Sequence, residues 1–101
     1  MITADFGVVP IGTDKTDLGD YVSVAVQAIK DSGLKYELTG MGTQIEAENL
    51  DELYAAIKSA QEAVFNVGTK RVFTVLKIDD RRDKKNRGLD DKISTVNEMI
   101  K

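Results

Sequence analysis

The sequence predicts a single α+β domain in which helices cover only one face of a β-sheet. Two periodicities support this prediction. Several segments alternate apolar and polar residues, as strands do, and others repeat apolar residues every three or four positions, as helices do. With 101 residues, the chain is long enough for one hydrophobic core but not for two. We therefore expect residues 1–101 to form one domain.

The stretch Lys35–Glu48 predicts a β-hairpin around which the other elements pack. Apolar and polar residues alternate on both sides of a Gly-X-Gly turn, as in strands with one buried and one polar face. Gly40 and Gly42 would allow positive φ, which a short chain reversal often needs. We therefore expect two short strands joined by a tight turn.

Two longer strands are expected near the ends of the chain. Ile2–Ile11 has one apolar and one mixed face, which suits a sheet covered on one side, and Pro10 and Gly12 end it. Lys70–Asp80 also alternates, although its second face includes Phe73 and is partly apolar. Both sides of this second strand are therefore expected to be covered.

Apolar residues at helical spacing predict helices over about Asp17–Ser32 and Leu50–Phe65. Thr16 or Asp17 is positioned to cap the first helix. Asn49, with a glutamate three residues later, has the spacing of a capping box before the second helix. Both helices should pack one apolar stripe on the sheet.

A third helix is expected at the end of the chain, after the charged loop Asp79–Gly88. Leu89, Ile93, Val96 and Ile100 repeat at steps of three and four residues and form a narrow apolar seam. A helix of about twelve residues is marginal in water by itself. This helix should therefore dock on another surface.

The order of these elements matches the split βαβ, or ferredoxin-like, arrangement with an extra C-terminal helix. Right-handed crossovers would place the first two helices on one face of a four-stranded antiparallel sheet. The spatial order of strands would then be fourth, first, third, second.

The uncovered sheet face should combine charged and apolar side chains. An exposed apolar patch of this kind usually marks a surface for a partner or ligand, and a solvated face with scattered apolar residues is the alternative. We expect a homo-oligomer with sheets face to face and the last helix contributing. By alternation, this face should carry Thr3, Asp5, Val9, Glu37, Thr39, Glu46, Glu48, Phe73, Val75 and Lys77.

The composition argues against several classes of function. The chain has no cysteine and no histidine, so disulfides, thiolate metal sites and histidine catalysis are excluded. We expect no metal, no cofactor and no catalytic residue, with acid–base chemistry by carboxylates as the remaining enzymatic alternative. The net charge of −3 gives no reason to expect nucleic acid or an anionic membrane. Neither a signal peptide nor a transmembrane segment is recognisable, so we expect a cytoplasmic protein.

Two charged or glycine-containing motifs have simpler interpretations than ligand binding. Gly40–Thr43 could cradle a phosphate, but it lacks the lysine of a P-loop and precedes a strand. The basic residues of Asp79–Arg87 are offset by aspartates and are not interleaved with aromatics. Turn formation explains the first motif, and a solvated loop or ion pairs between subunits explain the second.

Several stretches together resemble the thiamine-binding-protein-like family. They are VVPIG at Val8–Gly12, SGLKYEL at Ser32–Leu38, GMGTQIEAE at Gly40–Glu48 and RVFTVLKIDDRRD at Arg71–Asp83. The resemblance implies a ferredoxin-like fold, sheet-to-sheet dimers that pair into tetramers, and binding of thiamine or its hydroxymethylpyrimidine part without catalysis. Gly40 departs from a proline that is common in the family.

A ligand of this type offers N–H donors, ring-nitrogen acceptors and a cationic thiazolium. Carboxylates, hydroxyls and aromatic rings such as Tyr36 or Phe73 suit it, although carboxylates can instead pair with Lys35 and Lys77 across strands. We expect a non-catalytic, oligomeric small-molecule binder, with a structural or regulatory homo-oligomer as the alternative. The expected ligand-binding residues are Glu46, Thr43, Met41, Asp5, Glu37, Thr39 and Tyr36.

Overall fold

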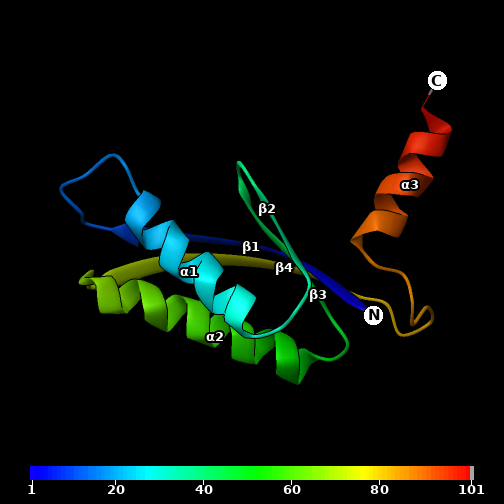
Figure 1. Cartoon of the computed structure of the whole chain (residues 1–101), viewed down its shortest axis with the longest axis horizontal. Coiled ribbons are helices and arrows are strands. Elements are labelled where there is room, and N and C mark those ends of the chain that lie inside the picture. The colour runs from blue at the N-terminus through cyan, green and yellow to red at the C-terminus, as the bar shows by residue number, and fades with distance from the viewer. Residues whose placement is uncertain (101) are drawn as a thin grey trace.

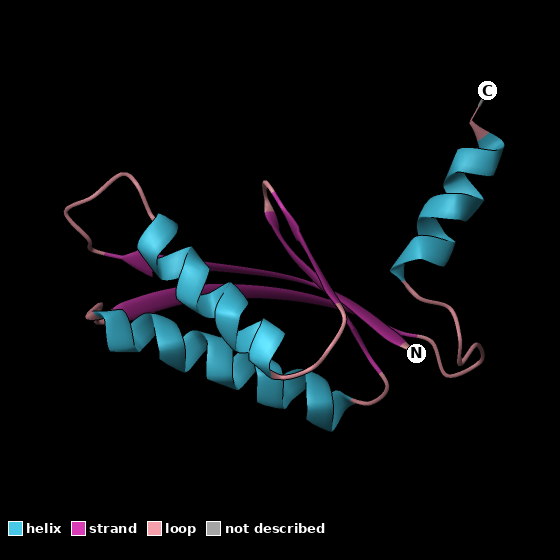
Figure 2. Cartoon of the chain, in the orientation of Figure 1, coloured by secondary structure: helices cyan, strands magenta, loops and turns pink. Residues whose placement is uncertain are grey.

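The computed structural model describes residues 1–100 and confirms the predicted α+β order (Figures 1 and 2). Helices α1 and α2 lie together over the sheet, whereas α3 stands apart near the N-terminal end of β1 (Figure 1). The elements are β1 (Ile2–Ile11), α1 (Gly19–Asp31), β2 (Tyr36–Thr39), β3 (Gly42–Ala47), α2 (Leu50–Val67), β4 (Arg71–Asp80) and α3 (Leu89–Met99).

The strands form one antiparallel sheet with the spatial order β2-β3-β1-β4 in residues 1–100, as the ferredoxin-like arrangement requires. β4 pairs with β1 along its whole length, from Ile2 opposite Asp80 to Ile11 opposite Arg71. β3 pairs only with the first half of β1, where Thr3 lies opposite Glu46. The fold prediction is therefore confirmed, including the order of strands.

The helix ends differ slightly from the expected ones. α1 begins at Gly19, where Asp17 Oδ1 accepts the Gly19 amide at 3.0 Å, and Leu18 holds the N-cap position without a side-chain bond. Asn49 caps α2 as expected, because its Oδ1 accepts the Glu52 amide at 2.9 Å. α2 continues to Val67, two residues beyond the expected end.

The glycines of the hairpin turn have a different role from the predicted one. Within residues 1–100, positive φ occurs at other glycines and not at Gly40 or Gly42, so that prediction is wrong. A Cβ added at Gly42 would lie 3.0 Å from Phe6 O and 3.3 Å from Asp5 Oδ1. Gly42 is therefore needed because β3 approaches β1 closely, and not because the turn requires positive φ.

The core lies between the sheet and the pair α1 and α2. Ile2, Phe6 and Ile45 from the sheet pack with Ile29 and Leu53 from the helices, and each is at most 2% exposed. Full burial of such a side chain contributes roughly 1.5–3 kcal/mol to stability.

Among residues 1–100, no helix has the length and apolar character that crossing a membrane would require.

α3 is attached to the rest of the fold mainly through its first turn. Its N-terminal end lies near the sheet, and its C-terminal end points away from all other elements (Figure 1). None of the α3 residues described is buried, and Ile93, Val96 and Met99 are 49%, 54% and 76% exposed. The expected docking of this helix is therefore only partial within one chain.

Candidate ligand-binding site

The sheet face opposite α1 and α2, here called the open face, carries the residues that alternation assigned to it, apart from Glu48. Asp5 on the central strand lies opposite Gln44 on β3 and Lys77 on β4. Thr3, two residues earlier, lies opposite Glu46 and Asp79. Directly opposed residues share a face, so these side chains form two neighbouring rows across three strands. Glu48 follows the end of β3 and is not part of these rows.

The structure does not bring all the expected ligand-binding residues together. Asp5, Glu37, Thr39 and Glu46 belong to the open face. Thr43 pairs with Phe6 on the helix-covered face and is 4% exposed, because it lies two residues from buried Ile45 and shares its face.

Tyr36 and Met41 also lie outside the open face. Tyr36 is opposite Ile45 and packs against the core. Met41 is at the tip of the hairpin and is 95% exposed. Thr39, Met41 and Thr43 line a smaller cavity of about 190 Å³ beside α1. The predicted residues therefore divide between two regions, and their ligand contacts stay a prediction.

A larger cavity of about 630 Å³ lies between the open face and α3. It is large enough for a small organic molecule. Its sheet side is mostly polar but includes Ala4 and Ile78, and its helix side is apolar apart from Lys92 and Asn97. Gln44 and Asp79 were not among the expected site residues, although alternation along their strands assigns both to the open face. The residues that shape this open-face cavity include Thr3, Asp5, Gln44, Leu89, Ile93 and Val96.

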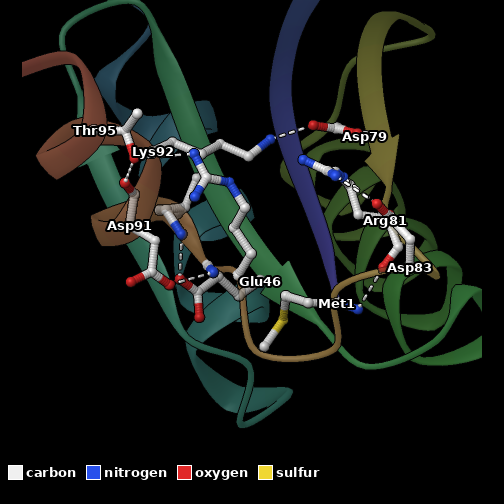
Figure 3. Close-up of polar contacts among 11 residues, drawn as sticks. Met1, Glu46, Asp79, Arg81, Asp83, Asp91, Lys92 and Thr95 are labelled. Carbon is white, nitrogen blue, oxygen red and sulfur yellow. Dashed lines mark hydrogen bonds and ion pairs between the residues drawn. The ribbon is translucent and has the colours of Figure 1, made fainter. Parts of the chain in front are cut away.

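Glu46 has partners within the chain and is not among the residues that line the open-face cavity. Its Oε1 accepts the backbone amide of Leu89 at 2.7 Å (Figure 3). The same oxygen lies 3.7 Å from Lys35 Nζ. The side chain is 13% exposed. The pairing with Lys35 matches the cross-strand alternative considered for this carboxylate.

Two ion pairs join α3 to the sheet. Lys92 Nζ donates to Asp79 Oδ2 (Figure 3), and Lys35 Nζ lies 2.8 Å from Asp90 Oδ2. The hydrogen bond from Lys92 lowers the pKa of Asp79, and the hydrogen bond to Asp90, with the nearby Glu46 charge, raises the pKa of Lys35. These shifts favour the charged forms of Asp79 and Lys35 near neutral pH.

The charged loop after β4 holds ion pairs within the chain. Arg81 Nη2 lies 2.6 Å from Asp83 Oδ2, and Arg82 Nη2 lies 2.9 Å from Asp80 Oδ2. These short-range pairs reduce the positive potential that a nucleic-acid surface would need. The observed geometry therefore agrees with an ion-paired loop, with partners from the same chain.

The far half of the open face is apolar and is not covered by α3. Val9 lies opposite Phe73, Gly7 opposite Val75, and Ile11 opposite Arg71. We call Val9, Ile11, Phe73 and Val75 the apolar strip. These side chains are between 37% and 57% exposed. Contiguous exposure of this kind is typical of a surface that contacts another molecule.

Fold and site together define a small ferredoxin-like domain whose sheet has one open face and a cavity beside it. This chain belongs to the family described as thiamine-binding protein, whose profile matches residues 4–97. The resemblance noted in the sequence is therefore confirmed. A UPF0045 protein of Methanothermobacter thermautotrophicus is 55% identical, and the alignment covers 99% of this chain and 100% of that protein.

Solved structures confirm the fold. The hypothetical protein MJ1052 of Methanocaldococcus jannaschii superposes with a TM-score of 0.85 and 35% identity, covering 96% of each chain. A Thermotoga maritima protein, for which a role in thiamine biosynthesis or salvage has been suggested, gives a TM-score of 0.79 at 23% identity. It covers 94% of this chain and 97% of its own, and at this identity the likeness concerns the fold alone.

Proposed function

We propose that this protein is a non-catalytic binder of thiamine or a related hydroxymethylpyrimidine, and that it works as a homo-oligomer with its sheets face to face. Membership of a family described as thiamine-binding supports the ligand class. The observation that carries the proposal is the open-face cavity, in which a carboxylate and an amide on the sheet face an apolar helix wall.

The cavity suits the chemistry of such a ligand. Within residues 1–100, Asp5 forms no ion pair with another side chain, so its carboxylate is available to a cationic or amino group. The Gln44 amide offers both a donor and an acceptor to an aminopyrimidine ring. Leu89 and Ile93 can contact the flat faces of the rings, which have no hydrogen-bonding groups.

Isothermal titration with thiamine and with hydroxymethylpyrimidine tests this proposal. Asp5→Asn should weaken thiamine binding by about tenfold or more, because a hydrogen bond to a charged group contributes roughly 1.5–3 kcal/mol. Glu62→Gln, on the exposed surface of α2, removes a carboxylate far from the open face and should bind like the wild type. No heat and no rise in melting temperature at millimolar ligand would refute the proposed ligand class.

The apolar strip favours a second candidate, a structural or regulatory homo-oligomer without a small-molecule ligand. Four exposed apolar residues on one sheet face can support assembly whether or not the cavity is filled. The two candidates differ in the titration, because assembly alone predicts stable oligomers that give no heat with either compound.

A further inference from the structure

α3 begins at a residue that cannot cap it. Gly88 is the N-cap and has no side chain, so it offers no acceptor to the free amides of the first turn. The Asp91 carboxylate accepts a hydrogen bond from the Gly88 amide at 2.8 Å, so this one backbone donor is satisfied within the helix. The acceptor for the next amide comes from another element, because Glu46 on β3 accepts from Leu89 at 2.7 Å.

The position of Glu46 is restricted on more than one side. Lys35 is held beside it because the Lys35 carbonyl accepts the Glu46 amide at 2.9 Å, and Lys35 Nζ also lies near the carboxylate. Gly88 is buried against the same carboxylate, and a Cβ added there would lie 2.8 Å from Glu46 Cδ. A carboxylate beside the first turn also interacts favourably with the positive end of the helix dipole.

Other attachments of α3 to the sheet are weaker. The pair of Lys35 with Asp90 joins exposed side chains, and in the pair of Lys92 with Asp79 the side chains are 33% and 52% exposed. Pairs this accessible to solvent usually contribute little. None of the described α3 residues is buried, so apolar packing within the chain does not fix the helix either. The hydrogen bond from Leu89 to the mostly buried Glu46 is therefore the best-protected polar contact of α3.

We propose that Glu46 is a positioning residue, which shapes the open-face cavity by holding α3 against the sheet and does not touch the ligand. The helix that it caps carries Leu89, Ile93 and Val96, which wall the cavity, whereas Glu46 itself lies outside the lining. The part of this inference that concerns the ligand rests on the proposed function, and the capping part does not. It assigns Glu46 a different role from the direct ligand contact expected from the sequence.

Hydrogen exchange of α3 tests the capping part on the full chain. Glu46→Ala removes the acceptor, and Gly88→Ala displaces the carboxylate while leaving it in the sequence. Both should speed exchange of the α3 amides by about tenfold, whereas Glu46→Gln keeps an acceptor oxygen and should stay within about threefold of the wild type. Gly40→Ala is the control glycine, because an added Cβ meets nothing within 4 Å. Unchanged α3 exchange in both Glu46→Ala and Gly88→Ala would overturn the proposal.

Titration of the same variants with thiamine separates positioning from contact. Positioning predicts that Glu46→Ala and Gly88→Ala weaken binding to a similar degree while Glu46→Gln restores it. Direct contact predicts instead that Glu46→Gln weakens binding and Gly88→Ala does not, and this result would overturn the proposal. If the wild type gives no heat with thiamine, the proposed function fails, and the exchange experiment still decides whether Glu46 holds α3.

Discussion

Replacing Phe73 with serine should dissociate the proposed sheet-to-sheet assembly. Phe73 is 57% exposed at the middle of the apolar strip, and a phenylalanine offers about 200 Å² of surface. The exposed part is therefore about 110 Å², which corresponds to about 3 kcal/mol at ~25 cal/mol per Å² if a partner buries it completely. A twofold interface contains two copies of the residue, so the dissociation constant should rise by at least about a hundredfold.

Sedimentation velocity across a concentration series measures this change directly. Phe65→Ser is the matched control, because Phe65 is also exposed, at 39%, but lies on α2 on the other side of the sheet. The control should sediment like the wild type, and Phe73→Ser should sediment as a smaller species. A wild type that is monomeric at tens of micromolar would refute the reasoning. Equal dissociation constants for the wild type and Phe73→Ser would refute it as well.

A further prediction concerns the stability of the fold. Gly42→Ala should lower the free energy of unfolding by roughly 1–3 kcal/mol in urea titrations, because the new Cβ would lie 3.0 Å from Phe6 O, whereas Gly40→Ala should change it by no more than about 0.5 kcal/mol. Equal stability of the two variants would contradict the close-approach role of Gly42.

The attachment of α3 should also depend on pH. Lys92 lowers the pKa of Asp79 below the ordinary value of 3.8 in the folded protein. The stabilisation from this ion pair is therefore present above pH 3.8, and it is lost as the pH falls through the lowered pKa of Asp79. Asp90 and Glu46 raise the pKa of Lys35 above the ordinary value of 10.5 in the folded protein. The stabilisation from the Lys35 ion pairs is therefore present below pH 10.5, and it is lost as the pH rises through the raised pKa of Lys35. Exchange protection of α3, corrected for intrinsic rates, should therefore be flat between these limits, and a midpoint near pH 7 would contradict the assignment.

The fold could be predicted from the sequence because strand alternation and helix periodicity are local and strong. The same alternation placed Asp5 and Glu46 correctly on the open face. It also shows why Thr43 could not join them, since residues two apart share a face and Thr43 lies two residues before buried Ile45. The resemblance grouped Thr43 with Glu46 by motif, and motif proximity ignores the face of the strand.

The position of α3 could not be predicted in the same way. Its apolar seam indicated that it must dock, but the contacts that attach it join residues far apart in the sequence. The hydrogen bond from the Leu89 amide to Glu46 joins residues 43 positions apart, and no local sequence pattern predicts that a strand supplies the acceptor for this helix. Gly88 at the start of the helix was the available signal, because a helix without a capping side chain needs an acceptor from elsewhere.

Methyl NMR during a thiamine titration tests the central claim most directly, because it reports where on the molecule a ligand sits. The open-face account predicts that the methyl signals of Leu89, Ile93 and Val96 shift with a common saturation curve, while those of buried Ile29 and Leu53 do not. Shifts confined to the helix-covered side, or no shifts at millimolar thiamine, would contradict it.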